Sequence, residues 1–286
     1  MTHPSHALPN RTRTSASIPR RLLREGKLHL LPVYALMRTS DLAREGIDNS
    51  GSFRFADHVY RREPSGRYGI GVLLDAVLLR MRSARSMRNR FLHAQREIIA
   101  AAERRAADLT TPFHVLSVPC GVARELARAS VTLRATLPVV HAHTRYFGLD
   151  VDPEPLALSR RLEGVDERFD FVRGDVFDAD VWPRDLDVIC STGLGEFLTD
   201  AMLGRFYRHA FAVLREGGVF VTSGMFPDPI ADYLMRELGE LRATYRGADE
   251  LVPLLVAAGF GDITARLDDV GLQTLIVARK PGGDAR

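Results

Sequence analysis

Hydrophobic residues are arranged in two different ways along the chain. From residue 31 to about residue 107 they occur in long runs with few turn-forming residues, a pattern that predicts helices. Beyond residue 110, short apolar runs alternate with helical segments, which is typical of repeated βαβ units and a parallel sheet. The pattern therefore predicts a helical lobe over residues 31–107 and an α/β domain over residues 108–286.

The α/β region holds enough short apolar runs for seven strands. Residues 186–190 are apolar except for Asp187, as expected of a parallel strand that is covered on both faces. The predicted strands are 113–118, 146–150, 169–173, 186–190, 219–223, 263–268 and 274–279. The predicted helices among them are 123–137, 154–162, 199–215 and 251–258, and Glu216-Gly217-Gly218 provides a stop signal for the third.

Two interruptions divide the helical lobe, at residues 49–53 and 63–71. The second contains Pro64, Ser65, Gly66 and Gly69, which are loop-forming residues. It fits either a functional loop or a plain connector between two packed helices. We expect the lobe to cap the site and to select the substrate.

Basic residues are concentrated at the N-terminus. Residues 1–30 contain six Arg or Lys residues and one Glu, a net charge of +5, which leaves −2 for the remainder of a chain whose formal charge is +3. This segment is also rich in Pro, Ser and Thr, and it predicts a basic, disordered tail. A basic nucleic-acid-binding face on the folded part is therefore disfavoured, although residues 24–105 remain locally rich in Arg.

Length and composition limit the remaining classes. At 286 residues the chain can form one catalytic domain with an extension. It has no apolar run long enough to cross a membrane and no signal-peptide pattern, so we expect a soluble, cytoplasmic protein without a membrane partner. Its two cysteines, Cys120 and Cys190, indicate neither a disulfide scaffold nor a structural metal site. The sequence does not indicate an oligomeric state.

The turn after the first predicted strand suits close approach of the backbone to a ligand. It reads Ser117-Val118-Pro119-Cys120-Gly121, and it contains a single glycine. Dinucleotide-binding turns use three glycines at G-x-G-x-x-G spacing, and phosphate-binding loops end in G-K-S/T. Neither pattern is present in the chain, so we do not expect a phosphate-binding loop at this turn, and the ordinary P-loop enzymes are excluded.

Carboxylates follow the next two predicted strands. Asp150 ends the second strand and Asp175 follows the third. Because the carboxyl ends of parallel strands meet at one edge of the sheet, the two acids share the edge at which open α/β sheets bind ligands. Asp150 could accept hydrogen bonds from a ribose diol and Asp175 could accept one from an adenine amino group. Taken singly, each acid also fits a solvated loop or a helix cap, as Asp152 before Pro153 does.

Over residues 110–281 the order and spacing of these segments resemble class I S-adenosylmethionine-dependent methyltransferases. The resemblance rests on VLSVPCGVARELA, GLDVDP, RGDVFD, DVICSTGLGEFL, VLREGGVFVTSG and the closing segment AAGFGDITARLDD with LQTLIVARK. It implies a doubly wound, seven-stranded, mostly parallel sheet with an N-terminal α-helical cap. It also implies S-adenosyl-L-methionine as the cofactor.

The resemblance assigns roles to individual residues. Gly121 would lie under the methionine part of the cofactor, Asp150 would bind the ribose hydroxyls, and Asp175 with Val176 would contact the adenine. The implied cofactor-binding residues are Ser117, Pro119, Cys120, Gly121, Asp150, Val151, Asp175, Val176, Ser191 and Thr192. Two departures stand out: Ser117 occupies the place of a strand-end acid that helps to bind the cofactor's amino group, and Pro119 and Ala123 replace two glycines.

The reaction that the resemblance implies is methyl transfer to a small-molecule acceptor. Such an enzyme acts mainly by positioning, and a base is needed only when the acceptor must lose a proton. Glu196, after the fourth strand, and Tyr68, in the helical lobe, are the candidate catalytic residues, although Glu196 fits the N-terminal charge of a helix equally well. Tyr68, Met225 and Phe226 could form an apolar wall against the sulfonium.

Two alternatives remain open. In the first, the α-amino group of S-adenosylmethionine attacks its own γ-carbon and expels methylthioadenosine, as in azetidine-2-carboxylate synthases, or the aminocarboxypropyl group is transferred to an acceptor. The missing strand-end acid at Ser117 motivates this alternative, because an unpinned amino group could act as the nucleophile. In the second, the chain is a non-catalytic binding protein on the same fold.

Overall fold

The computed structural model describes residues 17–282, and its contacts divide the chain into two compact units. The helical unit extends to Arg88 and includes the segment Pro227–Ala243, and the α/β unit consists of Asn89–Phe226 and the chain from Thr244 onward. The boundary therefore differs from the one expected near residue 107. Helix α6 (Arg82–Arg105) runs from one unit into the other. Helical periodicity alone does not reveal which unit a helix packs in.

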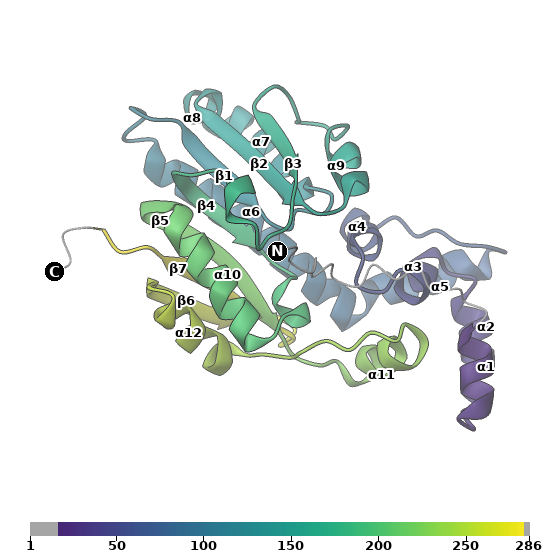
Figure 1. Ribbon diagram of the computed structural model, residues 1–286. Coiled ribbons are helices and arrows are strands. Elements are labelled where there is room, and N and C mark those ends of the chain that lie inside the picture. The colour runs from purple at the N-terminus through teal and green to yellow at the C-terminus, as the bar shows by residue number, and fades with distance from the viewer. Residues whose placement is uncertain (1–16, 283–286) are drawn as a thin grey trace. The chain divides into compact units, whose positions relative to one another are not determined.

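One sheet of seven strands forms the centre of the α/β unit within the described residues (Figure 1). Its order is β3-β2-β1-β4-β5-β7-β6, with β7 antiparallel to both of its neighbours and the other pairs parallel. The strands are β1 (Phe113–Ser117), β2 (Thr144–Asp150), β3 (Phe169–Arg173), β4 (Leu186–Ser191), β5 (Leu214–Met225), β6 (Gly261–Leu267) and β7 (Gln273–Arg279). The predicted doubly wound, seven-stranded, mostly parallel fold is confirmed.

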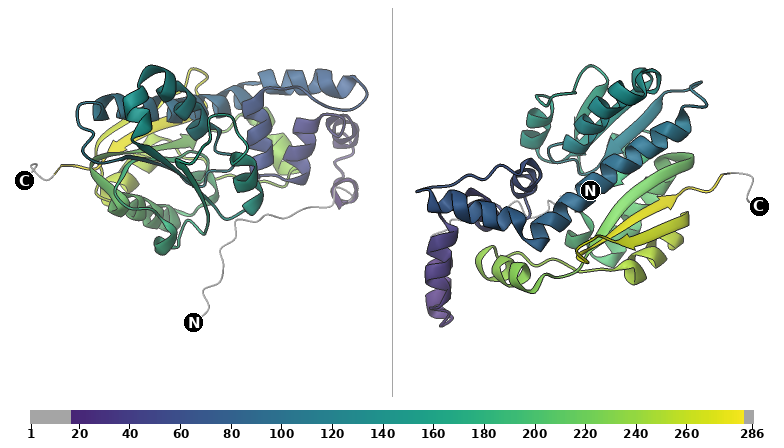
Figure 2. Two further views of the ribbon diagram at one scale, coloured as in Figure 1. Left: turned by 90° about the horizontal axis from the view of Figure 1, so that it is seen from above. Right: turned by 180° about the vertical axis from the view of Figure 1, so that it is seen from behind.

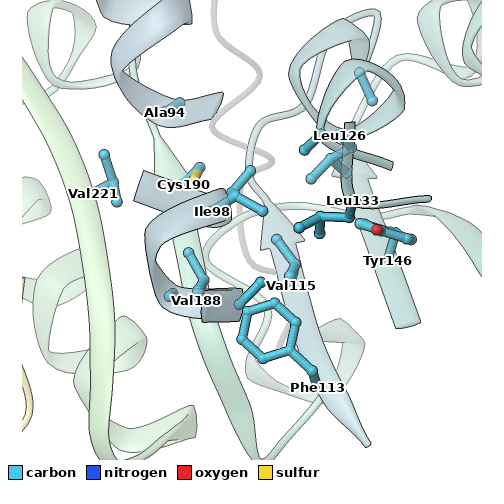
Figure 3. Packing of buried hydrophobic residues seen from close by; sticks show 14 of the residues in the cluster. Ala94, Ile98, Phe113, Val115, Leu126, Leu133, Tyr146, Val188, Cys190 and Val221 are labelled. Carbon is cyan, nitrogen blue, oxygen red and sulfur yellow. The ribbon is translucent and has the colours of Figure 1, made fainter. Parts of the chain in front are cut away.

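An apolar core lies on one face of this sheet. It joins α6 to α7 (Arg124–Thr136), α8 (Pro138–Ala142) and α9 (Pro153–Ser159). Ile98 of α6 and Leu126 and Leu133 of α7 pack against Val115 and Val188 of the sheet (Figure 3). These five side chains are fully buried. Burial of a Leu, Ile or Val side chain contributes roughly 1.5–3 kcal/mol, so this layer stabilises the central strands.

Aromatic side chains cover the opposite face. Phe206 and Tyr207 of α10 (Asp200–Val213) pack against Phe220 of β5, and the ring of Phe220 stacks on Phe260 at a centroid distance of 5.4 Å. Phe260 follows α12 (Ala248–Ala257). Helix α10 lies in front of the sheet in Figure 1, and the view from behind in Figure 2 brings α6 to the front. The sheet is thus covered on both faces, which leaves its edges and strand ends for ligand contact.

The strand order places a switch point between β1 and β4. From β1 the chain passes to β2 and β3 on one side, and it then crosses to β4 on the other side. Ser117, the last residue of β1, is in register with Gly148 of β2 and Cys190 of β4. Ligands of open α/β sheets bind outside the carboxyl ends of the strands at such a point.

The helical unit has a separate core. Its helices are α1 (Ser17–Arg24), α2 (Leu30–Met37), α3 (Asp41–Asp48), α4 (Phe53–Arg61), α5 (Ile70–Arg80), the start of α6 and α11 (Pro229–Leu238). One apolar cluster joins Ile18, Leu22, Leu30, Ile47 and Leu238. The distant segment that carries α11 is therefore part of this core.

Two expectations for this unit need correction. Residues 17–30, expected within a disordered tail, contain α1, because Ile18 and Leu22 lie on one helix face and are completely buried. Residues 1–16 of that tail lie outside the described residues. Helix α11 was not predicted, although Asp228 caps it by accepting a hydrogen bond from the N–H of Ala231 and Pro229 opens its first turn.

The stop signal after α10 also works differently from the prediction. The helix ends at Val213, before Glu216-Gly217-Gly218, and Gly217 has a φ of 72° within β5. The N–H of Gly217 donates to the carbonyl of Lys280, and the N–H of Lys280 donates to the carbonyl of Gly218. The glycine pair therefore extends the sheet rather than capping the helix.

Candidate cofactor site at the carboxyl edge of the sheet

The turn after β1 approaches the end of β2 closely. The N–H of Cys120 donates to the carbonyl of Leu149, and the N–H of Gly121 donates to Oδ2 of Asp150 at 2.8 Å. Gly121 has a φ of 50°, a conformation that side chains disfavour. Pro119 precedes Cys120 in the turn, and the Val118–Pro119 peptide is cis. Two N–H groups of the turn thus hold it against the end of β2, and the turn needs only one glycine.

Asp150 is a buried acid at the end of β2. Its Oδ2 accepts from Gly121 and its Oδ1 accepts from the N–H of Asp152 at 3.0 Å. Burial raises the pKa of Asp150 above its ordinary value, and the hydrogen bonds from Asp152 and Gly121 oppose that shift. Each carboxylate oxygen can accept more than one hydrogen bond, so both retain capacity for hydroxyl donors. Val151, the next residue, is exposed.

The end of β3 carries the second predicted acid. Oδ1 of Asp175 accepts a hydrogen bond from the N–H of Phe177 at 2.9 Å, which makes a local turn. Val176 is buried, and its carbonyl accepts from the indole N–H of Trp182. Asp175 is half-buried, so its carboxylate is held at the strand end without being enclosed.

The segment after β4 is held by two arginines. Nη1 of Arg90, from α6, donates to Oε1 of Glu196 at 3.1 Å, and both side chains are largely buried. The guanidinium of Arg246 donates to the carbonyls of Gly195 and Leu198 and to the carboxylate of Asp200. These contacts connect the segment after β4 to α6 and to the chain around Arg246.

Ser191 and Thr192 lead into this segment. Ser191 is buried, and its carbonyl accepts a hydrogen bond from Oγ1 of Thr222 in β5 at 2.9 Å. Thr192 is half-buried. Gly193 follows with a φ of 111°, and a Cβ there would lie 2.7 Å from Nη2 of Arg90. The backbone conformation therefore favours glycine at this position, and the guanidinium of Arg90 occupies the space that a side chain would take.

Both cysteines near the edge are unreactive in this setting. Cys120 and Cys190 are buried free thiols. Burial raises the pKa of each thiol well above its ordinary value. Because the thiolate is the nucleophilic form, neither thiol suits covalent chemistry.

A further acid, Glu125, was not among the residues identified from the sequence. It is the second residue of α7, and Oγ of Ser117 donates to its Oε1 at 2.5 Å. Burial raises the pKa of Glu125 above its ordinary value. The signal that could have identified it is an acid in the first turn of the helix that follows a strand ending in serine instead of an acid.

The ten predicted cofactor residues thus lie on the turn after β1 or at the ends of β1 to β4. The candidate base Glu196 lies in the segment after β4, in an ion pair. Tyr68 belongs to the helical unit, where it has a φ of 60° and an 85% exposed side chain. Phe226 packs so closely on Gly247 that a Cβ there would lie 2.7 Å from its Cζ.

Among residues 17–282, no helix is both long and apolar enough to cross a membrane. The same residues contain no group of three or more His, Cys, Asp or Glu side chains arranged to hold a metal ion.

A doubly wound sheet with an antiparallel seventh strand, and with its turn and acids at the switch point, defines a Rossmann-like class I methyltransferase, the class whose cofactor is S-adenosylmethionine. The chain belongs to the family described as “Putative methyltransferase”, whose model matches residues 34–280. No curated protein matches the sequence.

Solved structures share this fold. The chain is similar to a protein described as a possible exported protein from Bordetella parapertussis, with a TM-score of 0.75 and 22% identity over 96% of this chain and 99% of that chain. It is also similar to the S-adenosylmethionine-dependent methyltransferase SibL in its apo form, with a TM-score of 0.52 and 18% identity over 92% of this chain and 77% of that chain. At such identities the likeness establishes the fold alone.

Proposed function

We propose that this protein transfers the methyl group of S-adenosylmethionine to a small-molecule acceptor. The observation that carries the proposal is the hydrogen bond between the N–H of Gly121 and Asp150, which joins the turn after β1 to the acid at the end of β2. This contact lies beside the switch point of the sheet, where ligands of such folds bind. The family membership supports the same class of reaction.

The residues of the edge fit the parts of the cofactor. Asp150 would accept hydrogen bonds from the ribose hydroxyls through its remaining lone pairs. Asp175 and Val176 would contact the adenine, and Val151 would line the space between them. Gly121 would underlie the methionine part, because its missing side chain leaves room beside the turn.

The bound cofactor supplies an activated methyl group that an acceptor atom can attack directly. The protein's contribution is to hold both partners in line and to exclude water. Such positioning can supply about 7–11 kcal/mol of the barrier. Ser191 and Thr192 would border the reacting atoms, and the bonds of Arg90 and Arg246 keep the following segment ordered before the acceptor binds.

Glu196 and Tyr68 are proposed as the groups that could take a proton from the acceptor. Nη1 of Arg90 already donates to the carboxylate of Glu196, so an acceptor proton would have to reach a carboxylate that is engaged in an ion pair. An acceptor that loses no proton would need neither residue. A small-molecule acceptor is favoured over nucleic acid because the chain outside its first 30 residues carries a net charge of −2. A cytoplasmic location stays a prediction from the sequence.

Glu125 weakens the argument for ring closure within the cofactor. That alternative was motivated by Ser117, which leaves the strand end without an acid. However, Ser117 holds the carboxylate of Glu125 at the same place. An amino group beside this carboxylate would still be bound rather than free to attack.

The deciding experiment incubates the purified protein with S-adenosylmethionine, first alone and then with pools of small-molecule acceptors. Mass spectrometry quantifies S-adenosylhomocysteine and methylthioadenosine. We expect S-adenosylhomocysteine to accumulate only when a suitable acceptor is present. Steady release of methylthioadenosine without an acceptor would overturn methyl transfer in favour of ring closure. If S-adenosylmethionine does not bind in calorimetry, the chain is instead a binding protein that has retained the fold.

A further inference from the structure

Glu125 is a buried acid with little to stabilise its charge. It is only 9% exposed, and its one side-chain hydrogen bond within the described residues comes from Ser117. It takes part in no ion pair among those residues. Burying an ionised carboxylate without a cation is costly, so such groups usually have a cationic partner or carry a proton.

The position of Glu125 indicates where its partner would lie. Ser117 is the last residue of β1, at the switch point between β1 and β4. Its hydroxyl donates to Oε1 of Glu125 at 2.5 Å, and the turn that carries Cys120 and Gly121 begins directly after it. The carboxyl group of Glu125 therefore lies beside the carboxyl end of β1, where the turn that would hold the methionine part of the cofactor starts.

We propose that Glu125 binds the α-ammonium group of S-adenosylmethionine, and that Ser117 positions its carboxylate for this contact. The inference rests on the proposed function, since it assigns a binding residue within the same site. Serine at the strand end and glutamate in the next helix together replace a single strand-end acid. The serine hydroxyl donates to one carboxylate oxygen and orients the group toward the ligand.

The free protein offers an independent reason. Burial raises the pKa of Glu125, and only the Ser117 hydroxyl and the residue's own backbone N–H oppose that shift. The free protein therefore holds a proton on this carboxyl group more tightly than an exposed glutamate does. An ammonium group beside it would favour the ionised form, so binding of the ligand should release a proton.

The test compares two ligands that differ in the relevant group. S-adenosylhomocysteine carries the amino acid part, whereas 5′-methylthioadenosine has the same nucleoside without it. Titration calorimetry measures both dissociation constants for the wild type and for Glu125→Gln. We expect the variant to bind S-adenosylhomocysteine about 10- to 100-fold more weakly, the range expected when a charged hydrogen bond is lost. Its affinity for 5′-methylthioadenosine should change by less than about twofold, because that ligand lacks the charged partner.

Two further variants separate binding from structure. Ser117→Ala should weaken the binding of S-adenosylhomocysteine by a smaller factor, about 3- to 10-fold, because the carboxylate of Glu125 remains but loses the hydroxyl that orients it. The double variant Ser117→Asp/Glu125→Gln moves the acid to the strand end, and it should recover part of the lost selectivity for S-adenosylhomocysteine. A purely structural role for Glu125 predicts no such recovery.

The possible outcomes are distinct. Equal weakening of both ligands by Glu125→Gln, or no change in either, overturns the assignment of Glu125 and leaves the proposed function intact. A wild type that binds neither ligand overturns the proposed function and this inference with it. If Glu125→Gln does not fold, calorimetry of the wild type in two buffers still decides. S-adenosylhomocysteine must release more protons than 5′-methylthioadenosine, and the difference must grow as the pH is lowered toward the raised pKa of Glu125, because any proton released at Asp150 is common to both ligands.

Discussion

Two buried acids, one in each unit, show how differently a protein can use a carboxylate. Asp75 of the helical unit is completely buried and accepts four hydrogen bonds, from the Ser40 hydroxyl, the N–H groups of Leu42 and Ser65, and the His58 ring. Glu125 of the α/β unit accepts one, from Ser117. A saturated acid organises its own unit, whereas an acid with one donor retains capacity for a ligand.

The contrast extends to what surrounds each acid. Asp75 joins the start of α3 to the segment before α5, because its donors come from both places. Removing it would leave several buried donors without a partner. Glu125 joins only β1 to α7. Its loss would leave one hydroxyl without an acceptor, and it would also remove a buried charge.

The largest expected effect follows from this difference and concerns stability. Asp75→Asn presents an amide N–H₂ to groups that are themselves donors, so we expect the free energy of unfolding to fall by about 2–4 kcal/mol. Urea unfolding followed by circular dichroism measures this loss. Glu63→Gln, at an exposed carboxylate in the same unit, is the matched control and should change stability by less than about 0.5 kcal/mol. A change below about 1 kcal/mol in Asp75→Asn would mean that the four bonds contribute little.

The next effect separates Glu125 from its neighbour in the site. Asp150→Asn should lower the affinities for S-adenosylhomocysteine and 5′-methylthioadenosine by the same factor, about 10- to 100-fold, because both ligands carry the ribose. The ratio of the two affinities should therefore stay constant, whereas Glu125→Gln changes it. Calorimetry with both ligands provides the measurement, and Asp170→Asn, at an exposed position of β3, provides the control. A change in the ratio would place Asp150 at the amino acid part of the ligand and not at the ribose.

A smaller effect is the pH dependence of stability. The pKa of Glu125 is raised in the folded protein, so its contribution to stability is present below the ordinary carboxyl range and is lost as the pH rises through the raised value. The amide of Glu125→Gln does not titrate, so the variant does not lose stability in this way as the pH rises. Relative to the wild type, the variant should therefore gain about 1.4 kcal/mol for each unit by which the pKa is raised.

Urea unfolding of both proteins at a series of pH values measures this difference. The pKa of Asp150 shifts in the same direction, but Asp150 is present in both proteins and its contribution cancels. A saturating concentration of S-adenosylhomocysteine should reverse the advantage of the variant, because only the wild type gains the ammonium contact. If the difference in unfolding free energy between the two proteins is the same at every pH, the folded protein stabilises the charged form of Glu125 to the same degree as water stabilises that of an exposed acid.

The fold could be predicted because buried parallel strands and the helices between them leave a periodic signal. The limits of β3 were predicted to the residue, since turn residues flank its apolar core. Helix α11 and the helix over residues 17–24 were missed for a different reason. Both are short, and they are stabilised by a common apolar cluster and not by local propensity.

Candidate site residues could be predicted from the sequence where a single residue at a strand end suffices for a contact. Asp150 and Gly121 were identified from their places at strand ends, and the structure joins them by a hydrogen bond. Glu125 could not be identified in that way, because its task is shared with Ser117 across eight positions of the chain. Only the geometry of the strand end and the helix start shows that a serine followed by an acid can take the place of a strand-end acid.

Glu196 completes the comparison, because its charge is balanced by a cation already present in the protein. Glu196→Gln can still accept the hydrogen bond from Arg90, so we expect a loss of about 1 kcal/mol in unfolding free energy. The affinity ratio of S-adenosylhomocysteine to 5′-methylthioadenosine should stay within about twofold of the wild type, since a paired carboxylate has no free charge for an ammonium group. Arg90→Lys tests the same pair from its other side and should leave the ratio equally unchanged. If Glu196→Gln lowers the ratio, the ammonium group lies at the end of β4, and the assignment to Glu125 is wrong. If neither variant alters the ratio, Glu125 remains the acid in this site that a cationic ligand must neutralise.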